Sequence, residues 1–372
     1  MMETSQSEVL KWLREERPER LQELYARADA VRRENVGDAV HLRGLIEVSS
    51  YCERQCMYCG LRKANRSLER YRMTRAEIED CARMAVRLGY GTVVIQAGED
   101  DALTAEWVAG IVRWIKRETP LAVTLSLGER SEDELRLWRE AGADRYLLRF
   151  ETSDPKLFRA IHPFRFAERS DRLAQLKLIK QLGYEAGGGV MVGVPGQSYE
   201  SLAHDVLTFR TLDLDMIGIG PYIAHPATPL GSGQLCPPVD PAAQAPSSEQ
   251  MVYKVIALTR ILCPSANIPS TTALATINKK HGRVQGLKAG ANVVMPNLTP
   301  LQYRALYLIY PAKACIEESA VDCNQCLRGQ IRSLNRFPGR GTGGRGEFEA
   351  DAGVLRHSAS QLVQLQEAGY GG

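Results

Sequence analysis

Short apolar runs alternate with longer amphipathic stretches from residue 40 onwards. The apolar runs have the length of β-strands, and the stretches between them have the 3.6-residue periodicity of α-helices. The predicted strands span 41–49, 92–96, 122–127, 146–150, 188–194, 216–220, 268–270 and 292–295. The predicted helices span 74–88, 106–117, 133–141, 169–182, 198–212 and 248–262. This alternation predicts an α/β fold, a parallel (β/α)8 barrel of the TIM type, whose chemistry lies on the loops that follow the strands.

Segments of a different character flank the predicted barrel, which spans residues 40–335. Residues 1–39 form a predicted helical extension, in which Pro18 separates two amphipathic stretches. A long segment rich in Pro, Gly and Ala, 226–246, predicts a loop or lid after the sixth strand. Because glycine is frequent just after residue 337, we predict a flexible C-terminal tail over 336–372.

Composition narrows the class of partner. The 372 residues include 47 basic and 44 acidic side chains, a net charge of +3, so no long-range field favours nucleic acid or an anionic membrane. No apolar stretch approaches the ~20 residues of a membrane span, and the first residues do not resemble an export signal. We therefore expect a cytoplasmic protein whose nine cysteines are free thiols, and clustered thiols indicate metal or redox chemistry.

The first cysteine cluster follows the first predicted strand. Cys52, Cys56 and Cys59 have the spacing C-x3-C-x2-C, which lets three thiolates face one point. Three ligands leave one iron of a four-iron cluster open to bind a reactant, and the open position makes such a site catalytic. The alternatives are a structural zinc site, which normally takes four ligands, or three unrelated buried cysteines. The spacing and the aromatic Tyr58 before the third cysteine favour the iron-sulfur cluster.

The sequence around this cluster, Ser-Ser-Tyr-Cys-Glu-Arg-Gln-Cys-Met-Tyr-Cys-Gly-Leu-Arg at 49–62, resembles the radical S-adenosylmethionine (SAM) superfamily and, within it, the HydE-type maturases of iron-iron hydrogenase. Further similar segments follow in order at 71–74, 96–100, 124–129, 144–149, 191–197, 218–222, 268–273, 290–297 and 303–304. The resemblance covers roughly residues 40–345. It implies a [4Fe-4S] cluster on Cys52, Cys56 and Cys59 that cleaves SAM reductively.

The resemblance also implies a set of SAM contacts. They are Gln96, Gly98 and Glu99 for the methionine ammonium, Arg172 for the carboxylate, Glu151 for the ribose, and Tyr58 and Met191 beside the adenine. Ordinary structural roles are the alternatives: Glu99 as a helix N-cap and Arg172 as a solvated helix residue. For Glu151 the functional interpretation is favoured, because a carboxylate that closes an apolar strand is costly unless a partner pairs with it.

Polar residues at the ends of other predicted strands suggest a substrate pocket. The candidates are Thr124, Ser126, Arg149, Thr271 and Thr272, with Met295 and Tyr303 lining or closing the cavity. Alternation along the strands lets the hydroxyls and the guanidinium converge on a carboxylate, although threonines are also ordinary strand residues. By resemblance the substrate is a small organometallic molecule, a cysteine-bound iron carbonyl cyanide complex supplied by HydG. The maturase HydF and an electron donor are then further partners.

A second cluster, Cys315-x7-Cys323-x2-Cys326, follows the eighth predicted strand. It is similar to an accessory iron-sulfur site, [2Fe-2S] or [4Fe-4S], of some HydE-type proteins. A structural zinc ion and unligated thiols remain alternatives.

Two other functions remain open from the residues alone. One is a radical SAM enzyme of the biotin-synthase or methylornithine-synthase type that acts on a small organic substrate. The other is an iron-sulfur carrier or electron-transfer protein, which would give Glu151 and Arg149 no function and would not cleave SAM.

Overall fold

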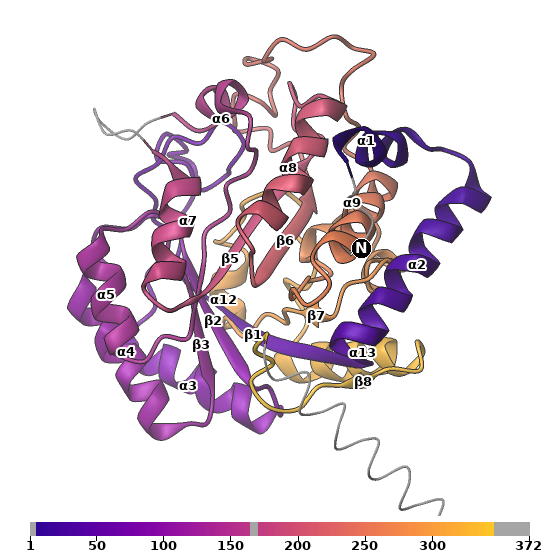
Figure 1. Cartoon of the computed structure of the whole chain (residues 1–372). Helices are drawn as coiled ribbons and strands as arrows, with labels where there is room; N and C mark the ends of the chain where they lie inside the picture. The colour runs from indigo at the N-terminus through magenta and orange to yellow at the C-terminus, as the bar shows by residue number, and fades with distance from the viewer. Residues whose placement is uncertain (1–4, 164–169, 346–372) are drawn as a thin grey trace, which may run out of the picture.

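A parallel sheet curls around the centre of the molecule, and helices cover its outer face (Figure 1). The computed structural model describes residues 5–163 and 170–345. The strands are β1 (Ala39–Ser49), β2 (Thr92–Ala97), β3 (Ala122–Ser126), β4 (Arg145–Leu147), β5 (Glu185–Val192), β6 (Met216–Pro221) and β7 (Val293–Val294). They follow one another in the order β6-β5-β4-β3-β2-β1-β7, and every pair is parallel.

Residues 267–270 connect the two ends of this sheet. Asn267 and Ser270 form bridges with β6, and Pro269 forms a bridge with β7. The sequence predicts a regular strand here, whereas the structure has isolated bridges, because Pro269 has no N–H to donate to a ladder. The TIM-type barrel predicted from the alternation of strands and helices is confirmed.

Six helices lie where the amphipathic stretches predict them, and those at 155–161, 272–277, 282–288, 301–304 and 320–332 were not predicted. Those around the barrel are α3 (Arg75–Arg87), α4 (Ala105–Glu118), α5 (Glu132–Glu140), α6 (Pro155–Ile161), α7 (Arg172–Gln181), α8 (Tyr199–Thr211), α9 (Glu249–Leu262), α10 (Thr272–Ile277), α11 (Gly282–Lys288), α12 (Leu301–Arg304) and α13 (Ala320–Arg332). Thr74 with Glu77 and Ser131 with Glu134 form capping boxes that fix where α3 and α5 begin. Every residue of β1 is buried, as expected for a parallel strand covered on both faces.

Two N-terminal helices, α1 (Gln6–Arg14) and α2 (Pro18–Val36), pack against α8 and α9. Lys254 of α9 is fully buried, donates to the carbonyl of Leu13 at 3.0 Å and pairs with Glu16 at 2.8 Å. This buried cation attaches the turn between the two helices to the barrel. In the described residues, no helix combines the length and the apolar character needed to cross a membrane.

The glycine-rich segment after α13 closes the N-terminal end of the barrel, contrary to the flexible tail that its composition predicts. A short strand, β8 (Phe337–Pro338), pairs with the start of β1. Beyond it, the carbonyl of Thr342 accepts from Thr92 at 2.7 Å, and that of Gly343 accepts from Arg43 at 2.9 Å. A Cβ on Gly343 would lie 2.5 Å from the His41 ring, so glycine there permits close packing. Residues 346–372 of the predicted tail lie outside the described range.

Candidate active site

The first cysteine cluster lines a cavity of about 250 Å³ at the C-terminal ends of the strands. Cys52, Cys56 and Cys59 lie on the irregular loop between β1 and α3. The structure brings them together with every residue predicted to contact SAM: Tyr58, Gln96, Gly98, Glu99, Glu151, Arg172 and Met191. The cavity is therefore lined by three thiols together with carboxylate and guanidinium groups.

The three thiols match the ligand set of a cluster with one open position. Burial raises the pKa of each thiol, that of Cys59 to about 12, so the protein alone keeps them protonated at neutral pH. A bound metal centre would stabilise all three as thiolates, which are its normal ligands. The loop also packs closely on β2, because a Cβ on Gly98 would lie 2.6 Å from the Cβ of Cys52. Glycine at position 98 thus allows the cysteine loop to approach the strand end.

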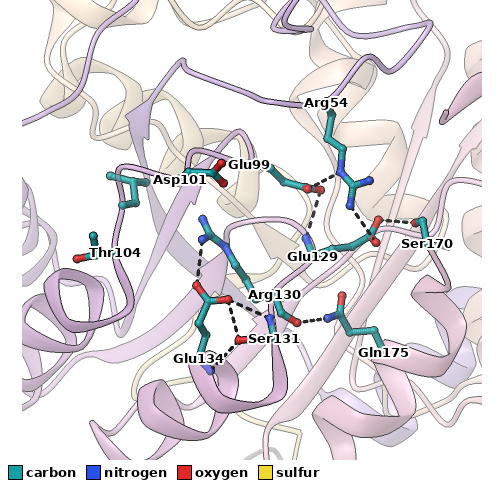
Figure 2. Close-up of a pocket in the computed structure, with 11 residues that line it drawn as sticks. Arg54, Glu99, Asp101, Thr104, Glu129, Arg130, Ser131, Glu134, Ser170 and Gln175 are labelled. Carbon is teal, nitrogen blue, oxygen red and sulfur yellow. Dashed lines mark hydrogen bonds and ion pairs between the residues drawn. The ribbon is translucent and has the colours of Figure 1, made fainter. Parts of the chain in front are cut away.

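A network of buried ion pairs borders this cavity. The Arg54 guanidinium lies between the carboxylates of Glu99 and Glu129, as Figure 2 shows. On the opposite side, Arg172 donates to Glu129 at 2.8 Å and lies 3.5 Å from Glu99. Burial raises the pKa of Glu129, but the charges of Arg172 and Arg54 and the hydrogen bond from Ser170 outweigh this and lower it far below its usual value. Both arginines therefore bridge the side chains of Glu99 and Glu129.

Arg54 and Glu99 also line a second hollow, of about 400 Å³, on the other side of the network (Figure 2). Glu99, Glu129 and His162 offer ligand atoms within 4.8 Å of one another. Two guanidinium groups already neutralise this cluster, so we interpret it as an ion-pair network. Sequence reasoning did not identify Arg54, Glu129 or His162, since each lies on a different loop or helix end and no local pattern connects them.

Glu151 has a backbone conformation that is rare for a side-chain-bearing residue. Its φ is 62°, in the left-handed region, directly after the strand-like segment that ends at Phe150. Such a conformation costs on the order of 1–3 kcal/mol and persists where surrounding contacts fix it. Glu151 is 7% exposed, and its carboxylate lies 3.1 Å from Arg149 Nη2. The backbone strain thus places a paired carboxylate on the cavity wall.

A smaller chamber of about 140 Å³ lies deeper in the barrel. Its wall includes the predicted residues Thr124, Arg149, Thr271, Thr272 and Met295. The hydroxyl of Thr124 is buried and has no hydrogen-bond partner among the described residues, which leaves it available to a ligand. Such an unpartnered buried hydroxyl is costly unless something binds it.

The chamber and the cysteine cavity are adjacent and share part of their walls. Both are lined by Gln96, Leu147, Arg149, Ala273, Ile309 and Tyr310. Ser126, predicted to lie with the substrate contacts, lines the cysteine cavity instead. A reactive species formed beside the cysteines would thus meet a ligand in the chamber without leaving the barrel.

Tyr303 does not line either cavity, and its predicted position is wrong. Its ring stacks on Tyr71 with centroids 4.5 Å apart, and its hydroxyl donates to Glu77 at 2.9 Å. Tyr307 and Tyr310 line the cavities instead. The error arises because Tyr303 lies on α12, whose orientation a residue count after the last strand does not determine.

The chamber also contains an ion pair that the sequence analysis missed. Glu47 of β1 and Lys313 are bonded to one another, and both are buried. Asn297 donates to the other oxygen of Glu47 at 3.0 Å. A signal existed for Glu47: polar residues at positions 41, 43 and 47 fall on one face of an otherwise apolar strand.

Two members of the second cysteine cluster are neighbours. Cys315 and Cys323 are hydrogen-bonded to one another, and Arg283 donates to Cys315 Sγ at 3.3 Å. The bond with Cys323 and the positive charge of Arg283 lower the pKa of Cys315 below its usual value, despite its burial. Cys326 lies one turn along α13 from Cys323 and is exposed.

A lid segment covers the cysteine loop. Leu230 donates from its backbone N–H to the carbonyl of Met57 at 3.0 Å, and its buried side chain packs with Leu157, Ile161 and Met191. This segment lies within the Pro-rich region 226–246. The loop predicted from composition therefore packs against the cysteine loop.

Comparison with known proteins agrees with this geometry. The family model of the radical SAM superfamily matches residues 46–208. The [FeFe] hydrogenase maturase subunit HydE of Thermotoga maritima is 47% identical over 322 residues, which cover 87% of this chain and 88% of that protein. The crystal structure of methylornithine synthase superposes with a TM-score of 0.76 at 26% identity, covering 93% of this chain and 96% of the other. HydG, a maturase of the [FeFe]-hydrogenase, shares the fold. Its crystal structure superposes with a TM-score of 0.74 at 17% identity, covering 93% of this chain and 74% of the other.

Proposed function

This chain belongs to the radical SAM superfamily and, within it, to the HydE-type [FeFe] hydrogenase maturases, and from that premise we propose its substrate and the roles of its residues. We propose that it cleaves SAM reductively in the cysteine cavity. The resulting 5′-deoxyadenosyl radical attacks the sulfur of a cysteine-bound iron carbonyl cyanide complex in the deeper chamber. The observation that supports this most directly is that the two spaces are adjacent and share six lining residues.

Cys52, Cys56 and Cys59 would hold a [4Fe-4S] cluster, since they are the three cysteines among the described residues that line the cavity, and three ligands leave one iron free. When bound and reduced, the cluster supplies one electron to the sulfonium of SAM, which releases methionine. The chain's own residues orient SAM for this step. Arg172 pairs with its carboxylate, and Glu151 accepts from the ribose hydroxyls, because an ionised carboxylate is an acceptor only.

Gln96, Gly98 and Glu99 receive the methionine ammonium at the end of β2, and Tyr58 with Met191 borders the adenine. The segment around Leu230 packs with Met191 beside this space; shielding from water there would suit a radical that must react only with its target. Arg149, Thr124, Thr271 and Thr272 bind the carboxylate of the cysteine ligand, and Met295 borders the chamber.

The substrate complex would come from HydG, and the product would pass through HydF towards the hydrogenase; a one-electron donor reduces the cluster. Cys315, Cys323 and Cys326 would hold an accessory iron-sulfur cluster. All nine cysteines are free, which supports our assignment of the protein to the reducing cytoplasm.

Anaerobic reconstitution followed by reduction with dithionite tests the proposal. We expect methionine and 5′-deoxyadenosine from SAM and the loss of both in Cys56→Ala. When the cysteine-bound iron complex is added, we expect faster release of methionine, with the adenosyl group recovered on the sulfur of the complex at the expense of 5′-deoxyadenosine. Formation of deoxyadenosine without any response to the iron complex would contradict the substrate assignment.

The structural likeness to methylornithine synthase supports one alternative, a small amino acid as substrate. Adding amino acids in place of the iron complex to the same assay distinguishes the two. An iron-sulfur carrier would produce no deoxyadenosine in either case.

A further inference from the structure

His162 connects the cysteine loop with the ion-pair network, and neither the cysteine spacing nor the proposed SAM contacts involve it. The residue follows the last residue of α6 and is fully buried. Its Nδ1 lies 3.1 Å from Cys56 Sγ. Its Nε2 lies 3.0 Å from Arg172 Nη2. One imidazole therefore joins a proposed cluster ligand to a proposed SAM contact.

The neighbouring backbone fixes this geometry. Met57, the residue after Cys56, donates its N–H to the carbonyl of Ile161 at 2.8 Å. The ring of Phe158 packs on the imidazole with centroids 4.9 Å apart. The end of α6 and the cysteine loop are thus bonded directly, and the imidazole plane is held by packing as well as by its hydrogen bonds.

The partners of the imidazole determine where its proton lies. A guanidinium has donors only, so Nε2 must accept from Arg172. The single proton of a neutral imidazole is then on Nδ1, which points at Cys56. Glu129 Oε1 lies 3.3 Å from Nε2 and would favour the other tautomer, but it already accepts from Arg172 Nε at 2.8 Å and Ser170 Oγ at 2.6 Å. A cysteine that ligates metal is a thiolate and can only accept, which agrees with a proton on Nδ1.

We propose that His162 is a positioning residue that donates an N–H···S hydrogen bond to the Cys56 ligand and thereby raises the reduction potential of the first cluster. The inference rests on the proposed cluster at Cys52, Cys56 and Cys59. A hydrogen bond to a ligand sulfur withdraws electron density and favours the reduced cluster, which carries one more negative charge. Arg172 holds the required tautomer, so SAM carboxylate binding and this hydrogen bond depend on one guanidinium.

The test is a redox titration of the reconstituted full-length chain, monitored by electron paramagnetic resonance without SAM. The signal that changes when SAM is added identifies the first cluster. In His162→Leu we expect reduction to become about tenfold less favourable, a shift of about 59 mV to lower potential for one electron. His162→Asn carries its amide nitrogen near the position of Nδ1 and should recover most of the shift. Phe158→Leu, the matched packing control, keeps the donor and should leave the potential near that of the wild type.

An unchanged potential in His162→Leu, with iron content equal to that of the wild type, would overturn the inference. If His162→Leu loses its iron, the comparison of Asn with Gln decides, because Gln carries its amide near the Nε2 position. Equal reduction potentials in His162→Asn and His162→Gln would then refute the role of Nδ1. A lower potential in His162→Gln than in His162→Asn would support it. If the wild-type chain itself binds no cluster, the proposed function fails, and the inference fails with it.

Discussion

The buried pair of Lys313 and Glu47 provides a quantitative test of how strongly the chamber wall depends on charge. Replacing Lys313 with Met keeps most of the side-chain volume and removes the cation. Glu47 is 2% exposed, so its carboxylate would remain buried without its cation. Breaking a buried ion pair in this way costs about 3–5 kcal/mol. Because Asn297 still donates to Glu47, we expect Lys313→Met to lower the free energy of unfolding by about 3 kcal/mol, the lower end of that range.

Chemical denaturation of the metal-free chain measures this loss, and a double variant identifies its origin. In Lys313→Met with Glu47→Gln both charges are absent, and Asn297 can still bond to the amide oxygen. We expect the double variant to recover at least half of the lost free energy of unfolding, because the penalty comes from the charge left without a partner.

A surface pair is the matched control. Arg14 and Glu200 also join distant segments, with 3.2 Å between nitrogen and oxygen, but their side chains are 44% and 51% exposed. Glu200→Gln should therefore cost less than about 1 kcal/mol. If Lys313→Met costs no more than this control, the pair is not desolvated in the way its burial indicates, and our reasoning about the chamber wall is refuted.

Three further predictions concern SAM binding, pH and the second cysteine cluster. Glu151→Gln should weaken SAM binding by about 1.5–3 kcal/mol, measured by calorimetry on the reconstituted protein, and an unchanged dissociation constant would remove Glu151 from the site. Burial and the charge of Arg172 lower the pKa of His162 to about 4 from 6.5, so the unfolded chain gains a proton that the folded one does not. Between pH 7 and pH 4 the free energy of unfolding of the metal-free wild type should fall by on the order of 3 kcal/mol more than that of His162→Asn. An equal fall in the two proteins, measured by chemical denaturation, would contradict this. Replacing Cys315, Cys323 and Cys326 with Ala should remove the accessory iron while deoxyadenosine formation persists. If deoxyadenosine formation stops although the first cluster is intact, the accessory site is required.

The features that the sequence determined are those set by local spacing. Cys52, Cys56 and Cys59 lie within eight consecutive residues, so their spacing alone brings three thiols to one point. Alternating apolar and amphipathic stretches gave the barrel, since backbone periodicity reports which side of each element is buried. Arg149 followed from the rule that strand ends of a parallel barrel meet at one edge, whereas Gln96 and Glu151 were implied by the family resemblance.

The tertiary structure alone decided which distant residues meet. Glu47 and Lys313 are 266 positions apart, and Cys56 and His162 are 106 apart, so no periodic pattern relates them. Composition likewise misjudged residues 338–345, where glycines that suggested flexibility instead permit close packing beneath the barrel. Local sequence fixes the direction in which a side chain leaves its own strand or helix. The partner that it meets depends on the register and packing of segments whose relative positions only the folded chain defines.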